Sequence, residues 1–197
     1  MSALVTSNAI WYVMRGSGVV SLLLLTGVVG LGIATSRRWS PKRTPRFVTA
    51  GLHRSIALLS VVFVALHVLS AVFDPYAVVG VAAVFVPFVA GRSAFWVGLG
   101  ALSLDLVVAL IVSSLLRSHL SPRLWRGVHW LAYAAWPLAL AHGVGMGTDN
   151  GTIWLQAMAA GCVGAVLALV GWRLGERARG PKRLERRPVP RLAEDLQ

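Results

Sequence analysis

The chain has 197 residues, of which 56% are hydrophobic and only 13% are charged. An average soluble domain is about 45–50% apolar and about 25% charged, so this composition excludes a disordered tail and argues against a water-soluble enzyme. The formal net charge of +12 is typical of nucleic-acid-binding proteins, or of membrane proteins whose cations set the topology. The single cysteine, Cys162, excludes an intramolecular disulfide, and this chain alone cannot build a thiolate zinc site or an iron–sulfur cluster.

Five stretches without charged residues are long enough to cross a bilayer, which takes about 20 helical residues. They lie between Arg15 and Arg37, from about Phe47 to Asp74, between Arg92 and Arg117, between Arg126 and Asp149, and between Asp149 and Arg173. We therefore expect an all-α membrane protein with a bundle of five transmembrane helices. The first stretch is too long for the apolar core of a secretory signal and no basic segment precedes it, so we expect it to be retained.

The segment 75–91 is apolar but differs from the five spans. It carries Pro75, Gly80 and Pro87, and the helix that fits between its prolines is only about 18 Å long. We interpret the segment as a short interfacial or re-entrant helix and not as a sixth span.

Basic residues collect in three regions, namely the first loop, the third loop and the C-terminal tail. They are Arg37, Arg38, Lys42, Arg43 and Arg46; Arg117, Arg123 and Arg126; and the cations from Arg173 to Arg191. With five spans all three regions lie on one side, and the positive-inside rule makes that side cytoplasmic, which gives an N-out, C-in orientation. A sixth span would place the third loop outside. Membrane topology thus accounts for most of the excess of basic residues. We therefore expect the lipid bilayer, and not nucleic acid, to be the partner of this chain.

The sequence divides into a helical transmembrane domain, 1–172, and a basic Pro/Arg-rich cytoplasmic tail, 173–197. We expect the tail to be solvated and to anchor to anionic lipid, with docking of a cytoplasmic protein as the alternative. Its length is insufficient for a flavin- or nicotinamide-binding domain, because the dinucleotide unit alone takes about 30 residues. The chain contains no GxGxxG motif.

Four of the five histidines lie in two predicted helices that run in the same direction. His53 and His67 are fourteen residues apart in the second span, and His129 and His142 are thirteen apart in the fourth. Each pair is separated by about 20 Å along its helix, so one histidine lies near each membrane face. The inner level then holds His53 and His129, and the outer level holds His67 and His142. Ionisable groups in a bilayer are costly and indicate function, and two facing histidines ligate a haem iron from both sides. Two levels predict two stacked haems.

The two spacings differ in how well they keep both histidines on one helix face. A fourteen-residue step returns to within about 40° of the same face, whereas a thirteen-residue step misses it by about 140°. Pro137, midway in the fourth span, is expected to kink or rewind the helix and correct this mismatch.

Three further residues, His119, Cys162 and Asp105, carry side chains that could ligate a metal or transfer a proton. His119 lies in a basic loop beside serines and is interpreted as a solvated residue, and Cys162 is interpreted as a small packing residue. Asp105, in the middle of the third span, is either a protonated structural group or part of a proton route.

The two histidine helices, LHRSIALLSVVFVALHVLSAVF and LWRGVHWLAYAAWPLALAHGV, resemble the ferric reductase-like transmembrane domain. This is the membrane module shared by NADPH oxidases, ferric reductases and the bacterial haem-binding MsrQ/YedZ proteins. Also similar are a PF before a loop, a W-x-G-x-G-A-L entry to the third span and the W-R-x-x-H-x-L-x-Y start of the fourth. The resemblance covers about residues 18–172.

The resemblance implies two b-type haems, an inner one between His53 and His129 and an outer one between the other pair. Electrons in that family enter from a cytoplasmic flavin and leave on the far side to an acceptor such as ferric iron or dioxygen. Because this chain lacks a flavin–NADPH domain, its donor is expected to be a separate cytoplasmic flavin reductase or the quinone pool. A small acceptor or a redox protein is expected on the outer side of a bacterial plasma membrane.

Three arginines are candidate contacts for the haem propionates, because guanidinium makes bidentate bonds to carboxylates. Arg54 and Arg126 are expected near the inner haem and Arg92 near the outer mouth. The alternative interpretation is ordinary topology charge.

Three other functions stay open on the sequence alone. The first is a single-haem MsrQ-like relay subunit driven by a quinol or a flavin, in which His53 is unused. The second is a di-haem cytochrome b subunit of a larger respiratory complex. The third is a haem-free structural membrane protein, which predicts no Soret band.

Overall fold

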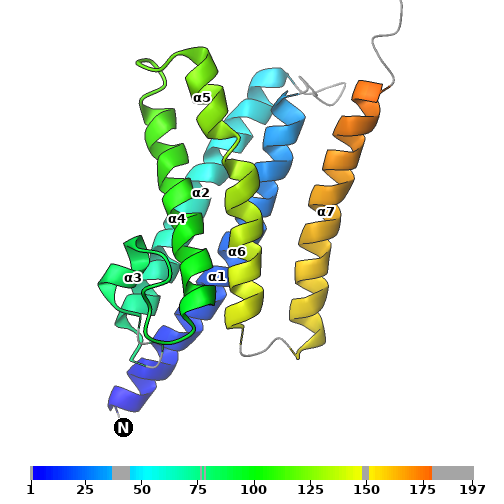
Figure 1. Cartoon of the computed structure of the whole chain (residues 1–197). Helices are drawn as coiled ribbons and strands as arrows, with labels where there is room; N and C mark the ends of the chain where they lie inside the picture. The colour runs from blue at the N-terminus through cyan, green and yellow to red at the C-terminus, as the bar shows by residue number, and fades with distance from the viewer. Residues whose placement is uncertain (1, 37–44, 76, 78, 148–150, 179–197) are drawn as a thin grey trace, which may run out of the picture.

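The computed structural model describes residues 2–36, 45–75, 77, 79–147 and 151–178, and over these residues it is all-helical, without strands (Figure 1). The helices are α1 (Ser2–Ser36), α2 (Arg46–Phe73), α3 (Val81–Phe85), α4 (Ala94–Leu115), α5 (Pro122–His129), α6 (Ala132–Met146) and α7 (Ile153–Ala178).

Four of these helices are long and apolar enough to cross a membrane within the described ranges. The spans are Asn8–Ser36, Phe47–Phe73, Ala94–Leu115 and Ile153–Gly175. Many of their large apolar side chains face outward; Leu58 is 60% exposed and Leu167 is 64% exposed. A surface of this kind is suited to lipid and not to water. The protein is therefore an all-α, multi-pass integral membrane protein.

Helix α1 begins earlier than the charge-free stretch predicts. Arg15 lies inside the helix and not before it, because arginine is a good helix former and a single charge does not end a helix. This extension by more than three turns brings the N-terminal half of α1 alongside the C-terminal end of α2.

The predicted fourth span is interrupted. Helices α5 and α6 follow one another, and a turn at Trp130 and Leu131 separates them (Figure 1). Short i→i−3 hydrogen bonds run through this turn, from Leu131 N to the Val128 carbonyl and from Ala134 N to the Leu131 carbonyl, both at 2.9 Å. The break lies nearly two turns before Pro137, and helix α6 continues through the proline. The proline ring crowds the carbonyl of Tyr133, four residues earlier, just after the break. Tighter turns advance about 120° per residue instead of about 100°, which removes part of the mismatch between the fourth-span histidines.

In the described part of the segment 75–91, the only helix is the five-residue α3, which packs on α4. A helix of five residues is about 7.5 Å long and cannot cross a bilayer. The chain after it turns through Phe88, whose φ is 70°, and its ring lies against Gly98. A Cβ at position 98 would lie 2.2 Å from that ring, so glycine is required there.

The helices pack as two long pairs, α1 with α2 and α4 with α6, and α7 lies against α1 (Figure 1). The core between them is centred on Ile33, which is fully buried, and Trp136 and Cys162 pack around it. Cys162 is 4% exposed, in agreement with the packing role predicted for it.

The remaining predictions concern His119, Asp105 and the C-terminal tail. His119 is exposed in the turn after α4, within hydrogen-bond distance of the Ser118 hydroxyl at 3.1 Å. Asp105 is half-buried on α4. The predicted boundary at residue 172 is not a structural boundary, because α7 continues to Ala178. The rest of the predicted solvated tail, 179–197, lies outside the described residues.

Candidate cofactor sites: two histidine pairs

The four membrane histidines form two facing pairs. The ring centroids of His53 on α2 and His129 on α5 are 6.3 Å apart, and the ring planes meet at 64°. The ring centroids of His67 on α2 and His142 on α6 are 6.1 Å apart, and the planes meet at 76°. The structure thus brings together the same partners that the matched depths predict.

The separation within each pair is suited to one metal ion. A metal–nitrogen bond of about 2.0–2.1 Å, with each imidazole centroid about 1.1 Å beyond its nitrogen, places two axial ring centroids about 6.3 Å apart. Over the described part of the chain no group of three or more His, Cys, Asp or Glu side chains converges as a metal site. A haem needs only two protein ligands, because its macrocycle supplies the equatorial nitrogens.

The outer histidines are held by hydrogen bonds to backbone carbonyls. Nδ1 of His67 lies 2.8 Å from the Met14 carbonyl on α1. Nδ1 of His142 lies 2.9 Å from the Trp96 carbonyl on α4. A carbonyl only accepts, so Nδ1 carries the proton in both rings and Nε2 keeps its lone pair for a metal. This is the usual way in which a metal-binding histidine is oriented.

The inner histidines have a different environment. The Nδ1 atoms of His53 and His129 are buried and make no hydrogen bond of normal geometry, although the Val28 carbonyl lies near His53. The His129 ring stacks on the indole of Trp125, with centroids 4.9 Å apart and planes 22° from parallel. The Arg117 guanidinium lies over the Trp125 indole, 4.6 Å from the centroid of the ring.

Two glycines of α1 make room for the α2 histidines. Gly18 lies against His67, and a Cβ there would be 3.0 Å from the ring; Gly32 lies against His53, where the distance would be 3.5 Å. Gly18 and Gly32 are fourteen residues apart, and so are His53 and His67. Because α1 and α2 are antiparallel neighbours, this equal spacing places one glycine opposite each histidine. This matched spacing is visible in the sequence, but its meaning depends on knowing which helices are neighbours.

Glycines play the same part around the outer ligand of α6. A Cβ at Gly100 of α4 would lie 2.6 Å from the His142 ring, and one at Gly145 would lie 2.0 Å from the Trp96 indole. The α4–α6 contact is therefore close enough for the Trp96 carbonyl to reach His142.

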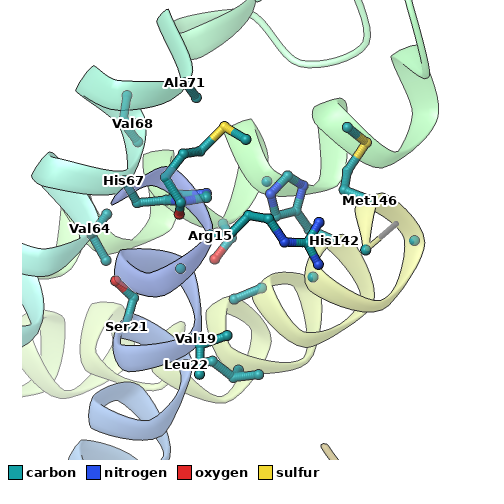
Figure 2. Close-up of a pocket in the computed structure, with 18 of the residues that line it drawn as sticks. Arg15, Val19, Ser21, Leu22, Val64, His67, Val68, Ala71, His142 and Met146 are labelled. Atoms are coloured by element: carbon teal, nitrogen blue, oxygen red, sulfur yellow. The ribbon is translucent and has the colours of Figure 1, made fainter. Parts of the chain in front are cut away.

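The outer pair faces a cavity of about 1530 Å³ (Figure 2). Residues of α1, α2, α4, α6 and α7 line it, and most are apolar. Ligand pockets usually measure about 300–1,000 Å³, so the space is sufficient for a group of haem size. The large cavity and the oriented nitrogens make the outer level the better formed of the two sites.

The arginines near the two histidine pairs have different environments. Arg92 lines the outer cavity, near which the sequence predicts it. Arg15, which sequence reasoning missed, lines the same cavity (Figure 2). Arg54 is exposed beside His53 on α2. Arg126 is exposed as well, and its Nε donates a hydrogen bond of 2.9 Å to the Pro122 carbonyl of its own helix. The sequence feature that could have identified Arg15 as a cavity residue is its position as a single cation within an otherwise apolar helix.

A buried indole lies between the two levels along α6. Trp136, which is 9% exposed, comes between His129 and His142 in the chain, and its Nε1 donates to the Thr26 hydroxyl at 2.9 Å. Thr26 in turn comes between Gly18 and Gly32 on α1, and its hydroxyl donates to the Leu22 carbonyl at 2.7 Å. This hydrogen-bonded contact ties α1 to α6 between the two histidine pairs.

Comparison of the chain with protein-family models, with curated proteins and with solved structures gave no match.

Proposed function

We propose that this protein is a membrane b-type cytochrome that carries electrons across the bilayer through two bis-histidine haems. It is a ferric reductase-like transmembrane component, and it acts as an oxidoreductase component. The observation that carries the proposal is the pair of histidine contacts at two levels of one bundle, with centroid separations of 6.3 and 6.1 Å.

The proposal includes five membrane crossings. Helices α5 and α6 with their turn run from Pro122 to Met146, and a chain of that length reaches about 37 Å when helical, which is enough to cross as a broken span. Helix α3 stays at one membrane face. The basic first loop, third loop and tail then lie on the cytoplasmic side, so the orientation is N-out and C-in.

Each residue around the sites has a definite task in this function. The four histidines would hold the two haems. Gly18, Gly32 and Gly100 leave room for the rings of His67, His53 and His142, respectively. A bound haem supplies one-electron Fe(III)/Fe(II) chemistry. With two histidines holding it, a haem would supply electron transfer and would offer no binding position for an acceptor.

Charged residues at the outer cavity are the candidate partners of the propionates. Arg15 and Arg92 both line the cavity, and guanidinium pairs with carboxylate through two charge-assisted hydrogen bonds. At the inner level Arg54 and Arg126 are exposed, which suits propionates that extend to the cytoplasmic interface.

The electron donor and the electron acceptor follow from the resemblance to the ferric reductase-like domain. A cytoplasmic flavin reductase or the quinone pool donates electrons to the inner site, and a small acceptor or redox protein takes them from the outer site. The membrane is the plasma membrane of a bacterium in this proposal, as the resemblance to MsrQ/YedZ proteins implies.

The test is a reduced-minus-oxidised absorption spectrum of detergent-purified protein, with the haem per chain quantified as the pyridine haemochrome. We expect a b-type spectrum and two haems per chain. Absence of a Soret band in protein expressed with a haem supply would overturn the proposal.

A single-haem relay is the second candidate function, and one observation favours it. Only the outer histidines, within the described residues, have both Nδ1 atoms bound to carbonyls and a cavity of haem size beside them. One haem per chain, retained in His53→Ala and lost in His67→Ala, would select this candidate.

A further inference from the structure

The helix that carries the inner histidine His129 has few packing partners. Helix α5 contacts mainly α4, and none of its eight residues, all of which are described, is buried. The outer rings of His67 and His142 are held through Nδ1 by carbonyls of neighbouring helices. Nδ1 of His129 is buried and, among the described residues, makes no hydrogen bond of normal geometry. The direction of the His129 ring therefore depends on what fixes α5 and the turn that follows it.

One side chain from another helix meets this turn. The Arg173 guanidinium on α7 lies 5.2 Å from the centroid of the Trp130 ring and 5.8 Å from that of Tyr133, and its Nη1 donates a hydrogen bond to the Tyr133 hydroxyl. The Trp130 and Tyr133 ring centroids are 5.1 Å apart, and Tyr133 N donates to the Trp130 carbonyl at 3.1 Å. A guanidinium within about 6 Å of an aromatic ring is attracted to it, and a charged donor makes the stronger class of hydrogen bond. Arg173 thus bridges two rings of one tight turn.

Both residues that Arg173 contacts are tied to His129 along the chain. Trp130 follows His129 directly, and Tyr133 comes about one helical turn after it. Tyr133 also packs against the buried cluster that contains Trp136. The Trp130 side chain is 56% exposed, so its own burial does not hold it in place. A displacement of Arg173 would therefore move the turn, and with it the His129 ring.

Resting on the proposed function, we infer that Arg173 is a positioning residue for the inner haem site. Its guanidinium fixes the turn at Trp130 and Leu131 against α7, and so holds the His129 ring opposite His53. The outer pair does not depend on Arg173, because carbonyls from α1 and α4 orient its rings.

The experiment compares Arg173→Gln with the natural full-length protein, purified in detergent and oxidised. The readout is the low-spin ferric electron paramagnetic resonance signal of each haem, which is sensitive to the angle between the two histidine rings. The signal that is missing in His129→Ala belongs to the inner haem. We expect Arg173→Gln to shift the inner signal and to lower the affinity for the inner haem by about threefold or more, since contacting residues are energetically coupled. The outer signal should stay in place.

Arg123→Gln is the matched control, because it removes an exposed arginine of α5 in place of the one on α7. It should change neither signal. Equal changes at both haems in Arg173→Gln, or none at the inner haem, would overturn the positioning role and leave the di-haem function intact. A natural protein without an inner haem would also overturn the positioning role, and one without any haem would overturn the proposed function as well.

A milder variant keeps the inference testable if Arg173→Gln does not fold. Tyr133→Phe keeps the aromatic ring and its packing, and removes only the oxygen that accepts the Arg173 hydrogen bond. We expect a change that is again confined to the inner signal but is smaller than in Arg173→Gln. An unchanged inner signal in Tyr133→Phe would contradict the positioning role.

Discussion

His142 on α6 donates its Nδ1 hydrogen to the backbone carbonyl of Trp96 on α4 at 2.9 Å. The contact joins residues far apart in the chain, and it determines both the tautomer and the direction of the imidazole. His67 has the equivalent bond to Met14 on α1. The rings of His67 and His142 are thus oriented by helices other than their own, which makes this histidine pair a rigid one.

Removing an outer ligand should remove the outer haem alone. His67→Ala and His142→Ala are each expected to lower the pyridine haemochrome from two haems to one per chain, because a single axial histidine holds the haem weakly. His119→Ala, in the exposed turn after α4, is the control and should keep both haems. Retention of full haem content in both outer variants would refute the ligand assignment.

A methyl group at Gly100 should disturb the outer site through its ligand. The added Cβ would lie 2.6 Å from the His142 ring, so the ring must move out of line with Trp96. Overpacking of this kind costs about 1–3 kcal/mol. We expect Gly100→Ala to lower the thermal midpoint and the outer haem content, as measured by circular dichroism and absorption.

Gly164→Ala on α7 is the matched control for that variant. Nothing lies within 4 Å of a Cβ at this position, and alanine is the better helix former. Its haem content and thermal midpoint should equal or exceed those of the natural protein. Equal losses in the two glycine variants would show that close contact with His142 is not the cause.

The hydrogen bond between Trp136 and Thr26 should contribute to the stability of the bundle. Trp136→Phe removes the donor and Thr26→Val removes the acceptor, and each is expected to cost about 0.5–1.5 kcal/mol of unfolding free energy. A double-mutant cycle in detergent isolates the pair. If the double variant loses the sum of the two single losses in unfolding free energy, the Trp136 and Thr26 side chains are not energetically coupled.

Pro137 should be needed for the register of the α5–α6 histidines. Pro137→Ala restores a backbone donor and favours a regular helix through the turn at Trp130 and Leu131. A regular helix turns His129 and His142 to different faces by about 140°, so we expect loss of one haem per chain. Pro122→Ala, at the start of α5, is the control, and it should leave the haem content unchanged.

Much of the architecture was predictable because it depends on short-range patterns. Apolar length predicts the spans, and the structure places α2 from Arg46 to Phe73, within one residue of expectation. The fourteen- and thirteen-residue spacings assign the histidines to two depths, since helical rise is constant. The pairing of His53 with His129 and of His67 with His142 follows from those depths, and the ring contacts agree with it.

What the sequence by itself determined is therefore the membrane class, most of the spans and the depth of each histidine, all of which follow from composition and helical periodicity. Only the tertiary structure decided that the helix breaks at Trp130 and Leu131 and that Arg15 reaches the outer cavity. It also decided which carbonyls orient the outer rings. A backbone carbonyl is the same at every residue, so its partner is selected by helix packing and leaves no trace in the order of side chains.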